Sequence, residues 1–309
     1  MRRIRAALMT AVLCLMTYGS MAAPVTGWIA LSDAGGVYVE TAEALRAEVE
    51  RTHPGRIDWR VAHSAQFRKT RPEPQWVVAV GSTALRDMQD LFADDPTPPL
   101  LLAVLIPRLA FERLADPSRL RAGQISAVFL DQPPARQMEL ARLAIPSLRA
   151  VGVLLGGESR AAAAALEKAA RERGFELLAR QVVGDGLFPA LQALLPEVDG
   201  LLAVPDPLVF NSQTATNILA ATYRRRIPLI GFSPAYARAG ALVSLYSSPD
   251  QIGVRGGEVL RQAFSSRILP PPQWPRDFVV RVNQDVARSL GLSIEEAQLA
   301  QQLRRAEKP

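Results

Sequence analysis

Residues 224–251 read RRRIPLIGFSPAYARAGALVSLYSSPDQ, and this stretch decides the fold class. It contains two short apolar runs, PLIGF (228–232) and ALVSLY (241–246), on either side of a polar insert. Continuous apolar runs of this length are typical of strands that helices cover on both faces of a parallel sheet. Ser233 and Tyr236 follow the first run directly, where a parallel sheet presents its ligand-binding loops. We therefore expect an α/β protein with a binding loop at this point.

The same pattern recurs along the chain from residue 28 onward. The other apolar runs are WIAL (28–31), WVVAV (76–80), LLLAVL (100–105), ISAVFL (125–130), AVGVLL (150–155), GLLAV (200–204) and FVVRV (278–282). Segments with apolar residues every three or four positions, such as ARQMELARLA, separate them and predict helices. Nine such runs are more than one small sheet usually holds. The sequence therefore predicts two doubly wound parallel sheets with right-handed crossovers.

Each predicted lobe consists of two separate segments of the chain, because three proline-containing stretches are suited to pass between the lobes. These stretches are DQPP (131–134), SSPD (247–250) and ILPPPQWPRD (268–277). The expected division is a first lobe of residues 23–130 plus 249–275 and a second lobe of residues 131–248 plus 276–309. We thus expect two lobes joined by three hinge crossovers.

The N-terminus has the features of a secretory signal peptide. Three arginines precede an apolar run that is too short to span a bilayer, and small residues follow, so cleavage after Ala22 is expected. Cys14 is the only cysteine, and Leu13 stands where a lipid-attachment site needs a small residue, so we do not expect a lipid anchor. The predicted location is the periplasm.

The composition excludes several classes of partner and cofactor. Once the three leader arginines are subtracted from 36 Lys+Arg, 33 remain against 30 Asp+Glu, a net charge of about +3 that does not indicate nucleic-acid binding. Two isolated histidines without a mature cysteine do not make a zinc site, and no Walker sequence or dinucleotide fingerprint is present. No cofactor and no metal are expected.

Four loops that follow predicted strands carry candidate ligand-binding residues. Ser82 and Thr83 come after a tight turn and either cap the next helix or also contact a ligand. Asp206 lies between two prolines and is either a solvated turn residue or a hydrogen-bond acceptor for a ligand. Asp33 precedes a glycine pair that can turn the chain or wrap a ligand, and Ser233 lies in the loop quoted above.

The segment GFSPA (231–235) comes close to the nucleophile elbow of serine hydrolases. However, Pro234 follows the serine and has no N–H for an oxyanion hole, and Ala235 replaces the second glycine. Both histidines, His53 and His63, precede the serine, whereas that elbow requires the base after it. We therefore do not expect a serine hydrolase, and the loop is better suited to positioning a ligand than to catalysis, so no catalytic residue is assigned.

From residue 125 to residue 292 the sequence resembles the substrate-binding proteins of tryptophan/tyrosine-type ABC transporters, which have the type I periplasmic-binding fold. The likeness is carried in order by ARQMELARLAIPSLRAVGVLLG, VDGLLAVPDPLV, the stretch 224–251 with its continuation IGVRGGEVLRQ, and VVRVNQDVARSLGLSI. VAVGSTAL in the first lobe is similar to the family's glycine-serine/threonine turn. Each fragment alone is weak, and their order and spacing make the match specific.

The resemblance implies a solute-binding protein that closes two lobes on a small organic molecule, amino-acid-like or a more apolar carboxylate, and delivers it to a membrane permease. It implies ligand contacts from Ser82 and Thr83 in the first lobe and from Asp206, Ser233 and Tyr246 in the second lobe or the hinge. Relatives often carry threonine and aspartate where this chain has Leu105, Ile106 and Pro107, which favours a more apolar ligand. A monomer is expected. A ligand-sensing subunit for a membrane receptor and, less favoured, a secreted α/β enzyme are the alternatives.

Overall fold

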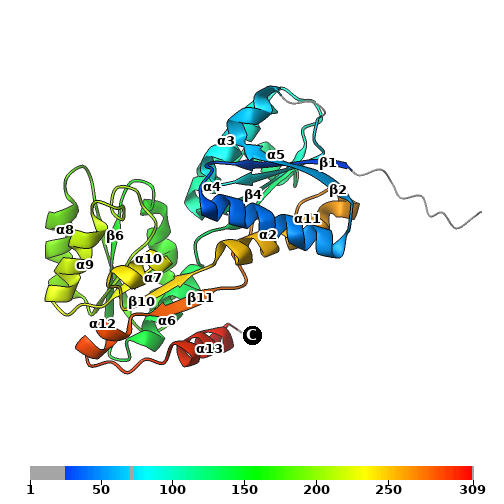
Figure 1. Ribbon diagram of the computed structural model, residues 1–309. Helices are drawn as coiled ribbons and strands as arrows, with labels where there is room; N and C mark the ends of the chain where they lie inside the picture. Colours follow the sequence, from blue (N-terminus) through cyan, green and yellow to red (C-terminus); the bar gives the residue numbers. More distant parts are fainter. Residues whose placement is uncertain (1–24, 70–72, 308–309) are drawn as a thin grey trace, which may run out of the picture.

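The computed structural model describes residues 25–69 and 73–307, which form two separate β-sheets flanked by helices (Figure 1). The first sheet has the strand order β2-β1-β3-β4-β5 and is parallel throughout. Its strands are β1 (Val25–Leu31), β2 (Ile57–His63), β3 (Trp76–Val80), β4 (Leu100–Ile106) and β5 (Ile125–Phe129). This sheet is built almost entirely from the chain before residue 130.

The second sheet has the order β11-β10-β9-β8-β6-β7. Its strands are β6 (Ala150–Leu155), β7 (Glu176–Gln181), β8 (Gly200–Leu202), β9 (Leu229–Gly231), β10 (Val243–Tyr246) and β11 (Val279–Val282). Both runs of the stretch 224–251 therefore form neighbouring parallel strands, β9 and β10, as the sequence predicts. The prediction of two α/β sheets is confirmed.

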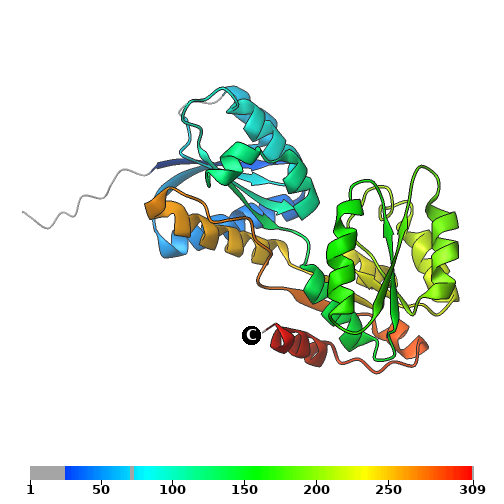
Figure 2. The same ribbon diagram turned by 180° about the vertical axis from the view of Figure 1, so that it is seen from behind.

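Helices cover both faces of the first sheet (Figures 1 and 2). One face packs against α2 (Gly36–Thr52) and α11 (Pro249–Ser266), and the other against η1 (Ser64–Lys69), α3 (Ser82–Leu91), α4 (Arg108–Leu114) and α5 (Pro117–Arg121). Because α11 is far from α2 in sequence, its packing along α2 ties residues 249–266 to the first lobe.

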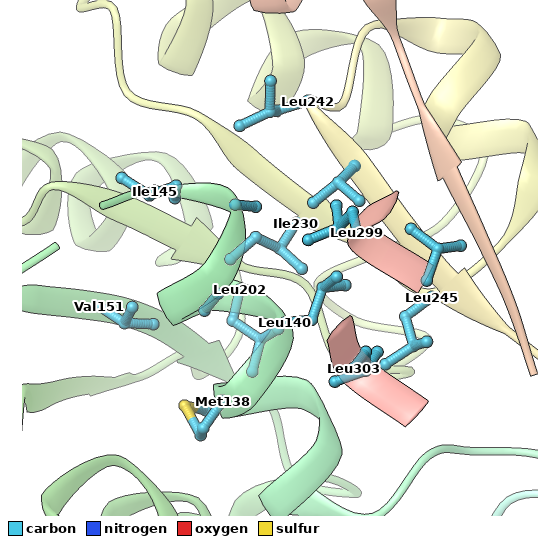
Figure 3. Packing of buried hydrophobic residues seen from close by; sticks show 14 of the residues in the cluster. Met138, Leu140, Ile145, Val151, Leu202, Ile230, Leu242, Leu245, Leu299 and Leu303 are labelled. Carbon is cyan, nitrogen blue, oxygen red and sulfur yellow. The ribbon is translucent and has the colours of Figure 1, made fainter. Parts of the chain in front are cut away.

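The second sheet is also covered on both faces. The helices on one face are α6 (Pro134–Ala144), α7 (Ala163–Arg171) preceded by η2 (Arg160–Ala162), α12 (Gln284–Ser289) and α13 (Glu296–Ala306). Figure 3 shows the centre of that core, where Met138 and Leu140 of α6 and Leu299 and Leu303 of α13 pack with Leu202 and neighbouring strand residues. The helices on the other face are α8 (Leu187–Leu194) with η3 (Leu195–Glu197), α9 (Ala215–Arg224) and α10 (Pro234–Ala239).

Two strands were not predicted, and one prediction of strand direction was wrong. β2 and β7 are edge strands whose residues are mostly half-buried or exposed, so they lack the continuous apolar run that marks the inner strands. β11 pairs with β10 in the antiparallel direction, so the second sheet is not wholly parallel. An edge strand that enters from a hinge crossover needs no helix before it and is free to run either way.

Within residues 73–307 the chain passes between the two sheets three times: after β5, after β10 and before β11. The expected leader, residues 1–22 with Cys14, lies outside the described residues. No helix of the described part of the chain is long and apolar enough to cross a membrane.

Candidate ligand-binding cleft

A pocket of about 320 Å³ lies between the two lobes, at the ends of strands from both sheets. We call it the cleft pocket. It is lined by Val37, Tyr38, Leu105, Leu130, Asp131, Gln132, Gln137, Pro205, Phe232, Ser233, Pro234, Leu245, Tyr246, Ser247 and Pro249. Its position at the carboxyl ends of the strands is where ligands bind in α/β sheets.

The first lobe contributes an apolar wall in which Leu105 is unusual. Its φ is +55°, in the left-handed region, and the register between β4 and β5 shifts between Val104 and Ile106 around it. A non-glycine residue in this conformation costs about 1–2 kcal/mol. Such backbone strain persists only where the surroundings impose it, and it concentrates at functional sites. Tyr38, in the first turn of α2, lies beside Leu105 on the same side of the cleft.

The second lobe contributes an aromatic wall and the hydroxyl group of Ser233. Phe232 follows β9 and packs on Tyr236 with the ring centroids 4.8 Å apart. Burial raises the pKa of Tyr236 to about 12, so its hydroxyl stays protonated at physiological pH. Ser233 begins α10 as its N-cap residue, but its side chain makes no capping hydrogen bond. Its hydroxyl is therefore available to a molecule in the cleft.

Tyr246, at the end of β10, lines the cleft pocket. A hydrogen bond from Arg281 on β11 to the Tyr246 hydroxyl favours the charged guanidinium and raises the pKa of Arg281. Leu245 and Phe232 line the same pocket.

The floor of the cleft is the first crossover, where Asp131 and Gln132 follow β5. An Asp131 oxygen accepts a hydrogen bond from the backbone N–H of Arg108, at 2.7 Å. Burial of the carboxylate outweighs this bond and raises the pKa of Asp131 to about 6. A smaller pocket of about 50 Å³ adjoins the floor and also borders Asp131, Gln132, Arg108 and Trp274.

A buried hydrogen-bond network joins the three crossovers beneath the cleft. Gln132 accepts a bond from Arg136 (2.6 Å) and donates one to Ser247 (2.9 Å), and Ser247 donates to the carbonyl of Asp277 (2.6 Å). Arg136 also donates to the carbonyl of Pro275 at 3.0 Å and pairs with Glu307 beyond α13. Each of the three crossovers therefore contributes a residue to one shared network.

The structure places Ser82 and Thr83 at the start of α3, beside the rim of the cleft but not in its lining. The expectation that one of them caps this helix was wrong. Gly81 is the N-cap residue with φ +92°, and the hydroxyl of Ser32 accepts the bond from the N–H of Ala84 at 2.8 Å. A Cβ at position 81 would lie 2.8 Å from the ring of Tyr38, so this turn also fixes the tyrosine.

The two predicted aspartates occupy different surroundings. Asp33 is exposed and accepts a bond from the N–H of Gly35 at 2.8 Å, which places it at the start of α2. Asp206 is only 3% exposed and accepts bonds from the N–H and the hydroxyl of Ser159 and from the N–H of Leu208. A Cβ at position 156 would collide with its carboxylate, so Gly156 is needed for this packing. Its hydrogen bonds therefore lie inside the second lobe, and a ligand contact from Asp206 stays a prediction.

The structure thus brings Ser233 and Tyr246 together in the cleft pocket and leaves Ser82, Thr83, Asp33 and Asp206 outside its lining. Sequence reasoning missed the ligand-facing position of Asp131. The signal was present, because DQPP directly follows an apolar run, but it was interpreted only as a crossover. The described residues contain no cluster of three or more His, Cys, Asp or Glu side chains that could hold a metal ion.

Comparison with known proteins agrees with this architecture. Residues 77–304 match the model of the family described as ABC transporter substrate binding protein. No curated protein matches the chain significantly in sequence.

Solved structures of low sequence identity share the fold. One is a domain in complex with L-Trp from Streptococcus pneumonia (TM-score 0.63, 14% identity, covering 89% of this chain and 97% of that one). A second is the ligand-free, open form of a substrate-binding protein with adhesive properties from Clostridium difficile (TM-score 0.70, 15% identity, 88% and 96% covered). A third is a periplasmic ribose ABC transporter protein from Conexibacter woesei (TM-score 0.56, 12% identity, 92% and 99% covered).

These neighbours are two-lobed proteins of the type I periplasmic-binding fold, to which the two sheets and the three crossovers correspond. The family match covers well over half of the chain. The chain belongs to the family of ABC transporter substrate-binding proteins.

Proposed function

We propose that this protein captures a small organic molecule in the cleft pocket and releases it to the permease of an ABC transporter. The observation that carries this proposal is the pocket itself, because its lining comes from both lobes and from the crossovers that join them. A ligand that contacts both lobes stabilises the closed arrangement over the open one by the contacts it gains. The proposed lobes are residues 23–130 with 249–275 and residues 131–248 with 276–309.

Most of the binding free energy comes from burial of apolar ligand surface against Leu105, Phe232 and Tyr246. The hydroxyl of Ser233 orients the ligand by one directed hydrogen bond. Ser82 and Thr83 stand at the rim on the first lobe, where closure brings them to the ligand. Asp33 belongs to the same rim, and Asp206 shapes the loop that carries Pro205 into the lining.

The lining also supports a role without covalent chemistry. Its polar side chains are amides, hydroxyls and one carboxylate, and none of them is paired with a base in the manner of an activated nucleophile. We place the working protein in the periplasm as a monomer, after removal of the predicted leader, with a membrane permease as its partner.

The test is a thermal-shift screen of the purified protein against amino acids, carboxylates, amines, sugars and polyols, since a ligand that binds the folded form raises the melting temperature. Any hit is then titrated against Tyr246→Ala, Ser233→Ala and, as a control, Ser212→Ala. Ser212 is exposed on the second lobe and does not line the cleft pocket.

We expect Tyr246→Ala to weaken binding tenfold or more and Ser233→Ala to weaken it by about 0.5–1.5 kcal/mol. Ser212→Ala is expected to bind as the unchanged protein does. Equal affinity in all three variants would show that the ligand binds elsewhere, and a screen without any hit would contradict the proposed function.

A further inference from the structure

The charges around the cleft are unbalanced. Asp131 is the only charged residue among those that line the cleft pocket. The cation nearest to it, Arg108, borders the smaller adjoining pocket, pairs with Glu112 at 2.5 Å and lies over the ring of Trp274. Arg136 is buried beneath the floor and is occupied by Glu307 and Gln132. The cleft therefore offers a ligand one negative charge and no positive side chain.

Helix N-termini could replace a positive side chain in binding an anion, but at three helices near this cleft one N–H group of the first turn is already bonded or missing. The amide of Ala84 in α3 donates to Ser32, and the amide of Gln251 in α11 donates to Ser248 in a capping box. α10 begins with Pro234, which has no N–H. Just before α2 the carboxylate of Asp33 accepts the N–H of the N-cap residue Gly35, which places a negative charge of the chain beside this helix N-terminus. These bonds and the negative charge of Asp33 make the helix starts weaker sites for a ligand carboxylate.

Asp131 itself lacks a cationic partner. It accepts the backbone bond from Arg108, and no salt bridge to it is found in residues 25–69 and 73–307. The charged groups that face it are Arg108, which favours its ionised form, and Glu112, which opposes it, both on α4. The lining residues contributed by α2, α6, α10, α11 and the strand ends are uncharged. Burial raises its pKa to about 6, so above that pH the pocket holds a poorly solvated anion.

The walls suit the body of an organic cation. Tyr38, Phe232 and Tyr246 line the cleft pocket, and aromatic ring faces attract ammonium groups as well as apolar surface. Leu105, held in the left-handed conformation, adds apolar surface to the same lining.

On the basis of the proposed function, we propose that the cleft selects an amine on an aromatic or aliphatic body without a carboxylate, with its ammonium group hydrogen-bonded to Asp131. An amino acid carries the same ammonium group, but its carboxylate has no cationic partner in this lining and loses part of its hydration on burial. The site is therefore specific for organic cations over both carboxylates and zwitterions.

Two matched series test this inference by calorimetric titration of the purified protein at pH 7.5. They are tryptamine, indole-3-propionate and L-tryptophan, and phenethylamine, 3-phenylpropionate and L-phenylalanine. We expect the amine of each series to bind at least tenfold tighter than its two partners. We also expect amine affinity to fall about tenfold between pH 7.5 and pH 5, because the amine stays charged while Asp131 becomes protonated.

Asp131→Asn keeps an oxygen for the N–H of Arg108 but removes the charge, so it is expected to abolish both the amine preference and the pH dependence. Glu167→Gln, which removes an exposed negative charge from α7 outside the cleft lining, is the control and is expected to keep both. Because the pH profile of the unchanged protein is an independent readout, the test does not depend on one variant.

The outcomes separate this inference from the proposed function. Tighter binding of a carboxylate or an amino acid, or an unchanged amine profile in Asp131→Asn, overturns the inference and leaves the proposed function standing. If none of the six compounds binds while the broader screen gives another ligand without an amine, the inference is again overturned alone. No binding in either screen overturns both.

Discussion

At the scale of single residues, the ionisation of Asp131 has a consequence for folding stability. Its pKa rises from 3.8 to about 6 because burial penalises the charged form, so the folded protein binds this proton more tightly than the unfolded chain does. The stabilisation that the proton brings is fully present below pH 3.8 and is lost as the pH rises through about 6. At neutral pH the charged group therefore opposes folding.

We predict that Asp131→Asn raises the free energy of unfolding by about 1–3 kcal/mol at pH 7.5 and has little effect at pH 4. Urea unfolding at the two pH values measures the difference. Glu112→Gln serves as the comparison, because its ion pair with Arg108 is exposed on the glutamate side and contributes little. An equal effect of Asp131→Asn at both pH values would contradict the claim that burial raises the pKa of Asp131.

Part of the cleft can be predicted from sequence at this scale, and part cannot. Ser233 was found because it directly follows an apolar run, and parallel strands place such residues at one edge, whereas Tyr246 was predicted from the family resemblance. Asp206 follows a run in the same way, yet its carboxylate is bonded to Ser159, almost fifty residues earlier. A single sequence does not reveal such a distant partner, nor does it reveal that Leu105 has a positive φ.

At the scale of elements, the packing of α2 on α11 depends on small residues in α11. Gly253 and Gly257 face α2, and a Cβ at position 253 would meet the backbone oxygen of Thr41 and the side chain of Ala44. Helix backbones cannot move apart here without loosening the core beneath them, where Leu45 and Val259 are fully buried. Gly253 is therefore required for the close packing of α11 on α2.

We predict that Gly253→Ala lowers the free energy of unfolding by about 1–3 kcal/mol, the cost of overpacking, despite the better helix propensity of alanine. Gly36→Ala is the control, because a Cβ there has no neighbour within 4 Å and α2 begins at that residue. It is expected to be neutral or stabilising by about 0.4–1 kcal/mol. Thermal or urea unfolding compares the two variants, and a neutral Gly253→Ala would show that the helices have room to separate.

The position of a strand in its sheet explains whether it could be predicted from the sequence. Runs such as WVVAV and AVGVLL are continuous because helices bury both faces of the strand, and these strands were identified. β2 reads IDWRVAH and β7 reads ELLARQ, with polar residues interleaved because each lies at an edge. The direction of β11 could not be deduced, since a strand that returns from a hinge carries no mark of its orientation.

At the scale of the whole molecule, the three crossovers behave as one hinge. Gln132 lies at the centre of their shared network, 3% exposed, with one bond to Arg136 and one to Ser247. Buried networks of this kind are costly to leave partly satisfied. The hinge therefore keeps its hydrogen bonds only if the crossovers move together.

We predict that Gln132→Leu, which leaves Arg136 and Ser247 without this partner, lowers the free energy of unfolding by about 1–3 kcal/mol. Gln301→Leu on α13 changes an exposed glutamine in the same way and is expected to stay within about 0.5 kcal/mol. Urea unfolding measures the free energy of unfolding of the two variants. Equal losses would contradict the role of Gln132 at the centre of the network.

The central claim is that the two lobes close on a ligand, and an interlobe distance tests it most directly. Arg86→Cys on α3 and Arg238→Cys on α10 place fluorescent labels at exposed positions on helices from opposite sides of the cleft. Single-molecule energy transfer is measured with and without a saturating hit from the ligand screen. We predict a shift to a shorter distance on binding, which Tyr246→Ala requires more ligand to produce. An unchanged distance at saturation would contradict the account.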